Sequence, residues 1–180
     1  MTDEEEINSP LGLAKQVRQL MKMPQHLCKQ RGICCRVATF KGSLSHDQIG
    51  AIAADPSHPA HEQARIFHSI FLPYPSQAVV RTIASEFVDR VREQSDDPDN
   101  ISFFHCRYVQ SDGRCGVHED RPVGCRVYPF PHENTAYHPG CGFEQQGAEN
   151  WNQIKQILSK LGLSSDLTPI KNPDPGDAKA

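Results

Sequence analysis

The distribution of seven cysteines is the feature that most constrains what this 180-residue chain can fold into. They form two groups separated by a long stretch without cysteine: Cys28, Cys34 and Cys35, then Cys106, Cys115, Cys125 and Cys141. Thiolate sulfur is a preferred ligand of zinc and of iron–sulfur clusters. The pattern therefore predicts a metal or iron–sulfur site that two distant parts of one small domain build together.

The composition makes such a site useful for folding. Hydrophobic residues make up 37% of the chain and the mean hydropathy is −0.57, which indicates a modest apolar core. Metal binding to a site that exists only in the folded state adds its free energy to folding. We therefore expect one domain with an internal metal staple.

The expected compartment is the cytoplasm. No apolar run is long enough to span a membrane, and the acidic start Met1-Thr2-Asp3-Glu4-Glu5-Glu6 is unlike a secretory signal. In a reducing compartment thiols serve as ligands or redox groups more often than as disulfides, and an odd number cannot pair completely. The net charge of −3 argues against nucleic-acid binding, which needs clustered cations.

The hydrophobic pattern predicts a mainly α fold with a small β-hairpin, organised as a single irregular domain around the cysteine site. Residues 1–9 are expected to be a flexible N-terminus, 10–162 the cysteine-cluster domain and 163–180 a disordered tail. Apolar residues recur at helical spacing over about 10–22, 46–54, 60–71, 76–92 and 147–161. The segment 103–109 reads as a strand, and a turn at 111–113 would bring Cys106 and Cys115 together.

Cysteine spacing alone does not identify the metal. The chain has no Cys-x-x-Cys pair, so it lacks both the zinc knuckle and the ferredoxin run. Adjacent side chains diverge, so Cys34 and Cys35 suit different centres better than one ion. A four-ligand site with a three-ligand site, and a single four-ligand site with three structural or redox thiols, both stay open. His118, three residues after Cys115, is the best non-cysteine candidate ligand.

The second cysteine group carries a family resemblance. The runs Gly113-Arg114-Cys115-Gly116-Val117-His118 and Arg121-Pro122-Val123-Gly124-Cys125-Arg126-Val127-Tyr128-Pro129-Phe130 resemble the signature of the YkgJ-type cysteine-cluster proteins. The resemblance covers residues 25–145 and implies a zinc- or iron-chelating domain. Some relatives resemble flagellin lysine N-methylases that carry an iron–sulfur cluster.

The first cysteine group departs from that family pattern. The family places Cys-x-x-Cys-x-x-Cys-Cys upstream, and Cys28, Cys34 and Cys35 match three of these four cysteines. Arg31 stands at the position of the fourth, and Cys141 is a candidate to compensate for it. Within the second group, Arg121 is expected to donate hydrogen bonds to thiolates or carbonyls, and Tyr128 and Phe130 to shield the centre from water.

These observations lead to three hypotheses of function. The first is a metal-binding protein that chelates an iron–sulfur cluster, with 4Fe-4S favoured, or zinc through the seven cysteines. The second is an iron–sulfur-dependent protein-lysine methyltransferase-like enzyme, for which the sequence offers no catalytic motif and no catalytic residue. The third is a zinc-stabilised module that contacts a protein partner. No membrane or nucleic-acid partner is expected.

Overall fold

The computed structural model describes residues 7–40, 43–132 and 135–163. It is mostly helical, with one small antiparallel sheet, which confirms the expected mainly α architecture. Of the predicted flexible segments, 1–9 and 163–180, residues 7–9 and 163 are described, and the rest lie outside the described residues.

The sheet has three strands in the order β1-β3-β2, with β3 in the centre. The strands are β1 (Ala38–Thr39), β2 (Phe71–Pro73) and β3 (Phe103–Cys106). Ala38 lies opposite Phe104 on one side of β3, and Phe71 lies opposite Cys106 on the other. The predicted two-stranded hairpin is therefore wrong in its partners, because β3 pairs with strands that precede it by many residues.

A tight turn after β3 nevertheless brings Cys106 and Cys115 towards each other, which was the expected effect of the hairpin. Val109 and Cys115 form an isolated antiparallel bridge, and the backbone N–H of Gly116 donates to the carbonyl of Tyr108 at 2.8 Å. The turn folds the chain back on itself directly after Cys106. It brings Cys115 towards the end of β3.

Each of the five predicted helices is present within a few residues of its expected bounds, and short helices carry several cysteines. The helices are α2 (Pro10–Leu20), the 3-10 turn η1 (Gln25–Leu27), α3 (Ile33–Arg36), α4 (His46–Ala54), α5 (His61–Ile70), α6 (Gln77–Glu93), α7 (Val123–Val127) and α8 (Glu144–Lys160). The sequence missed α3 and the strands β1 and β2.

Side-chain caps begin α2 and α4 as the sequence predicts. The Ser9 hydroxyl accepts the backbone N–H of Gly12 at 3.1 Å, with Pro10 at the first helical position. Ser45 and Gln48 form a reciprocal capping box, in which each side chain accepts the other residue's backbone N–H. These caps satisfy backbone donors that the first turn leaves without partners.

Three small apolar clusters form the core. The first packs α6 on the sheet through Val80, Phe87 and Phe103. The second packs the α4–α5 pair on the other side of β3, around the fully buried Phe104. The third consists of Met23, Tyr137 and Phe143, with Leu27, Cys28 and Cys141 packed against it.

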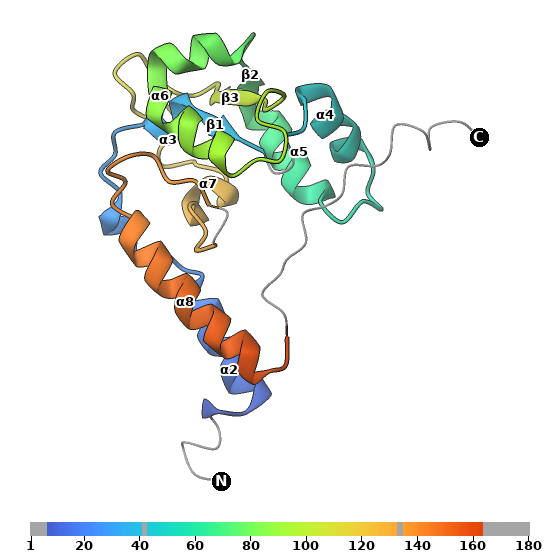
Figure 1. Ribbon diagram of the computed structural model, residues 1–180, viewed down its shortest axis with the longest axis vertical. Coiled ribbons are helices and arrows are strands. Elements are labelled where there is room, and N and C mark those ends of the chain that lie inside the picture. The colour runs from blue at the N-terminus through green and yellow to red at the C-terminus, as the bar shows by residue number, and fades with distance from the viewer. Residues whose placement is uncertain (1–6, 41–42, 133–134, 164–180) are drawn as a thin grey trace, which may run out of the picture.

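Helices α2 and α8 lie side by side and extend from the rest of the molecule (Figure 1). The Asn150 side chain, which is buried, donates to the carbonyl of Leu20 at 2.7 Å and so ties the two helices together. Gly147 lies where a Cβ would overlap the Tyr137 hydroxyl. The base of this pair therefore reaches the third apolar cluster, against which two of the cysteines pack.

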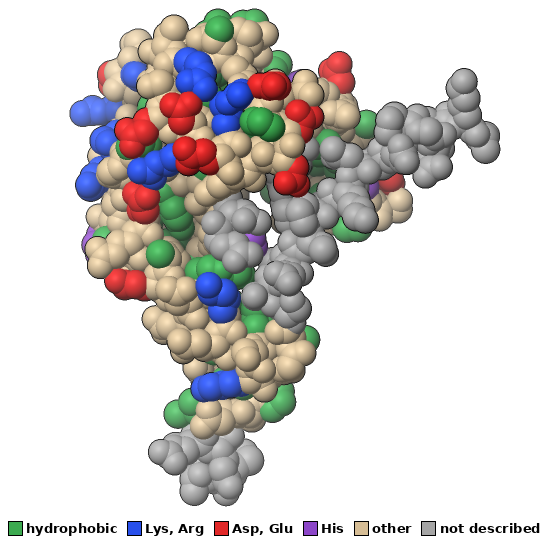
Figure 2. All heavy atoms as spheres, viewed as in Figure 1, with side chains coloured by type: hydrophobic (Ala, Val, Ile, Leu, Met, Phe, Trp, Pro, Cys, Tyr) green, Lys and Arg blue, Asp and Glu red, His purple; other side chains and the backbone are tan. Residues whose placement is uncertain are grey.

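Charges on the face of the molecule formed by α6 are mixed in sign (Figure 2). Arg81 pairs with Asp89 at 2.7 Å, and Arg90 pairs with Glu144 of α8 at 2.7 Å. Exposed pairs of this kind contribute little to stability. Among the described residues, no helix has both the length and the apolar character that crossing a membrane requires.

The side chain of His138 is buried near the first apolar cluster. Its ring stacks on Phe87 at 3.7 Å between centroids, and its Nε2 lies 2.9 Å from the Val37 carbonyl. Its Nδ1 is buried and has no hydrogen-bond partner among the described residues. Burial lowers the pKa of His138 to about 4, with Arg31 and Arg90 acting in the same direction and the Val37 carbonyl opposing them. The neutral ring, with Nε2–H donating, therefore fits this site.

We expect His138 to make the protein less stable as the pH falls from about 6.5 to about 4. In this window the unfolded chain binds a proton that the folded chain does not, so protonation favours unfolding. The loss should be about 2 kcal/mol between pH 7 and pH 5. Urea unfolding at both pH values should show a smaller loss in His138→Gln than in wild type. The control His26→Gln replaces an exposed histidine and should lose as much stability as wild type. A loss in His138→Gln equal to that of wild type would contradict the role of His138.

Candidate metal centre

The first cysteine group lies on a short loop and a helical turn. Cys28 ends the 3-10 turn, and Cys34 and Cys35 lie within α3. Gly32 precedes α3 with φ of 67°, a left-handed backbone conformation that glycine adopts without strain. Its carbonyl accepts the backbone N–H of Cys35 at 3.0 Å. Gly32 thus allows the chain to turn directly into the segment that carries the adjacent cysteines.

Two backbone contacts press the first cysteine loop against the second half of the chain. A Cβ on Gly32 would overlap the carbonyl of Gly113, which lies in the turn before Cys115. A Cβ on Gly142 would overlap the carbonyl of Leu27, which directly precedes Cys28. Only glycine fits where two backbones approach this closely. These contacts bring the two cysteine groups, distant in sequence, to the same place.

The second cysteine group comes from four separate segments. Cys106 ends β3, Cys115 follows the turn, and Cys125 lies in α7. Cys141 precedes α8, and its backbone N–H donates to the carbonyl of His138 at 2.9 Å. Cys106 is buried and the other six cysteines are partly buried, so burial protects them without sealing them from solvent.

The charges of the thiols act on one another across both groups. The pKa of Cys125 is raised first by burial and then by Cys106, Cys115 and Cys34. The pKa of Cys106 is raised by burial and then by Cys115 and Cys34, although backbone N–H donors oppose this. The pKa of Cys141 is also raised mainly by burial, with further contributions from Cys34 and Cys28. All seven cysteines therefore belong to one electrostatic neighbourhood.

Cys34 and Cys35 behave differently although they are adjacent. The pKa of Cys34 is lowered because the Cys35 thiol donates a hydrogen bond to it, and the pKa of Cys35 is raised for the same reason. Backbone N–H groups and the Arg121 guanidinium also lower the pKa of Cys34. The arrangement favours a thiolate at Cys34. Since thiolate is the form that binds soft metals, Cys34 is the thiol best prepared to be a ligand.

Backbone amides lie near the sulfurs of cysteines from both groups. The N–H of Tyr108 lies 3.4 Å from the Cys106 sulfur. Backbone N–H groups also act to lower the pKa values of Cys34 and Cys141. Hydrogen bonds of this kind stabilise thiolates and set the reduction potential of iron–sulfur clusters. The donor set, soft sulfur with amide support, matches a thiolate-bound metal or cluster.

Within the described residues, no three His, Cys, Asp or Glu side chains converge on the position of one metal ion. A tetrahedral zinc site with Zn–S bonds of about 2.3 Å would need such convergence. The four cysteines of a 4Fe-4S cluster each bind a different iron, so their sulfurs lie further apart. Among the described residues, then, no site for a single ion is preformed.

The other expected contributors take different positions. The side chain of His118 is exposed, and its carbonyl accepts the Nε–H of Arg121 at 3.0 Å. This bond fulfils the expectation that Arg121 donates to a carbonyl. Tyr128 is 40% exposed, but burial strongly raises the pKa of its hydroxyl, with Cys34 and Cys141 adding to the effect. Phe130 is 44% exposed, so it is a poor shield for the thiols.

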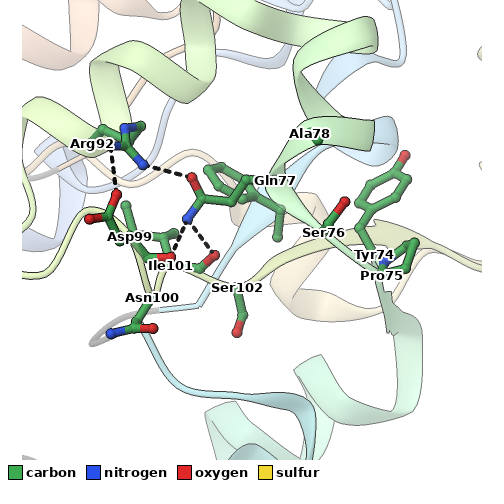
Figure 3. A pocket seen from close by; sticks show the side chains of 11 residues that line it. Tyr74, Pro75, Ser76, Gln77, Ala78, Arg92, Asp99, Asn100, Ile101 and Ser102 are labelled. Atoms are coloured by element: carbon green, nitrogen blue, oxygen red, sulfur yellow. Dashed lines mark hydrogen bonds and ion pairs between the residues drawn. The ribbon is translucent and has the colours of Figure 1, made fainter.

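A separate hollow of about 500 Å³ lies between the start of α6 and the segment before β3 (Figure 3). The polar groups that line it are already bonded to one another. Arg92 donates to the Gln77 side chain at 2.9 Å and pairs with Asp99 at 2.9 Å. Gln77 in turn donates to three backbone carbonyls, those of Pro98, Asp99 and Ile101. None of the described residues that line the hollow is a cysteine, and its polar network is structural.

Replacing Gly32 should separate the two cysteine groups. We expect Gly32→Ala to lower the free energy of unfolding by at least about 2 kcal/mol, because the methyl group adds a backbone overlap to the left-handed strain. Gly162→Ala provides the matched control, since Gly162 also has φ of 67° but no described atom lies within 4 Å of where its methyl group would be. Urea unfolding compares them. Equal losses in the two variants would show that the contact with Gly113 is unimportant.

The comparisons with known proteins leave the chain without a family assignment. No protein-family model matches the sequence, and no curated protein or solved structure is significantly similar to it. The likeness to the YkgJ-type proteins therefore remains an expectation based on the cysteine motifs.

Proposed function

We propose that the protein binds an iron–sulfur cluster, with 4Fe-4S favoured, or zinc through its cysteines. The observation that carries the proposal is that thiols of both groups lie close enough to act on one another: Cys34 helps to raise the pKa values of Cys106, Cys125 and Cys141. A backbone N–H, that of Tyr108, also lies 3.4 Å from the Cys106 sulfur. By their mutual effects on pKa, Cys34, Cys35, Cys106, Cys115 and Cys125 form an inner group, and Cys28 and Cys141 border it.

The adjacent pair Cys34 and Cys35 and the lack of any Cys-x-x-Cys pair favour the cluster over the single ion. A bound cluster would supply one-electron transfer, and the amide donors would tune its potential. The partial exposure of Cys34, Cys115 and Cys125 would allow a redox partner to approach. The methyltransferase-like alternative rests on the family resemblance alone, so we do not extend the proposal to that reaction.

A zinc-stabilised interaction module is the second candidate, and one observation favours it. The cysteines lie where loops and helical turns of four residues or so meet, between three small apolar clusters. Short elements of this kind gain stability from a metal that joins them. In this alternative the metal holds the fold together and takes part in no electron transfer.

Anaerobic purification followed by metal and sulfide analysis separates the two candidates. Iron with acid-labile sulfide and a broad visible absorbance is the expected result. Stoichiometric zinc without colour would support the interaction module instead. A protein with neither metal, after anaerobic reconstitution with iron and sulfide or with zinc, would refute chelation.

Cysteine variants should affect metal content unequally. We expect Cys115→Ser and Cys125→Ser to lose most of the metal and to lower the melting temperature, because both thiols belong to the inner group. Cys28→Ser should lose less, since Cys28 packs beside the third apolar cluster near Cys141. Metal analysis and thermal unfolding measure both effects. Equal metal content and equal melting temperature in all three variants would contradict the grouping.

A further inference from the structure

The loop that carries Cys141 is held by cations of the first cysteine loop. The Arg31 guanidinium donates through Nη2 to the Pro139 carbonyl at 2.9 Å. The Lys29 ammonium donates to the Gly140 carbonyl at 3.1 Å. Both carbonyls directly precede Cys141. Two charged donors from one loop therefore bind the two peptide groups that lead into this cysteine.

Backbone packing supports the same contact independently. Gly140 adopts φ of 68°, and a Cβ there would lie 3.6 Å from Nη1 of Arg31. Gly142 lies against the Leu27 carbonyl so closely that a Cβ would overlap it. The left-handed conformation favours glycine at position 140, and Gly142 lets the Cys141 loop lie directly against residue 27.

We propose that Arg31 and Lys29 are positioning residues that hold Cys141 beside Cys34 as a thiolate ligand. The inference rests on the proposed metal site and deepens it. Arg31 fixes the peptide group that follows Pro139, and with it the loop that carries Cys141. Arg31 itself does not touch the metal. Its effect on metal binding passes through Cys141.

Anaerobic titration with Co²⁺ tests the proposal, because the intensity of the thiolate-to-cobalt absorption band follows the number of coordinating thiolates. Charged hydrogen bonds of this kind are worth enough to change affinity by about three- to tenfold. We expect Arg31→Gln to weaken Co²⁺ binding by that factor and to reduce the band as Cys141→Ser does. Lys29→Gln should act in the same direction but less strongly.

Three further variants distinguish an effect of Arg31 on the position of Cys141 from a general loss of stability. The double variant Arg31→Gln/Cys141→Ser should bind Co²⁺ no more weakly than Cys141→Ser alone, since Arg31 has no other route to the metal. Arg31→Lys, which keeps a charged donor, should restore most of the affinity. Arg114→Gln removes an arginine that is 82% exposed and should match wild type. Additive losses in the double variant, or a wild-type band in Arg31→Gln, would overturn the proposal.

Hydrogen exchange of the metal-free protein distinguishes this inference from the proposed function. Arg31→Gln should speed exchange of the Cys141 amide, which donates to the His138 carbonyl, while Arg114→Gln should not. If wild type binds no metal but this exchange difference is present, the proposed function fails and the positioning contact stands. Unchanged exchange in Arg31→Gln would overturn the positioning contact itself.

Discussion

The close backbone contact between Gly32 and Gly113 is the constraint on which the cysteine site depends. It joins a loop near the start of the chain to a turn that follows the central strand. A side chain at Gly32 would overlap the Gly113 carbonyl and push the two segments apart, and the cysteines they carry would separate with them. Hydrogen bonds from Lys29, Arg31 and Arg36 to carbonyls of the facing loops extend the same contact. The fold brings the thiols together through its backbone, before any metal contributes.

The electrostatics of the thiols follow from this assembly. Burial raises the pKa values of Cys106, Cys125 and Cys141. Cys34 is the exception because Cys35 donates a hydrogen bond to it and Arg121 lies near. An adjacent pair of cysteines therefore gives one thiol prepared to ionise and one that stays protonated. Metal binding to the remaining thiols would have to release their protons.

The sequence predicted the long helices well, because caps and apolar spacing are local signals. Ser45 and Gln48 form the capping box that begins α4, and Gly162, with positive φ, follows the end of α8. The partners of β3 could not be predicted, because β1 has only two residues and β2 three, too few to show a pattern. The seven cysteines were identified as a group from their types. Their mutual arrangement, the role of Gly142 and the buried hydroxyl of Tyr128 depend on contacts between distant segments, which local patterns do not contain.

The pairing of α2 with α8 has a consequence for the order in which the protein can be made. Asn150 bonds to the carbonyl of Leu20, and Cys28 shares an apolar cluster with Cys141, so elements from early and late in the chain complete the same region. During synthesis the first three cysteines leave the ribosome long before their partners. The region that residue 141 and α8 complete is absent until then. The proposed metal site could therefore be complete only after almost the whole described chain has been synthesised.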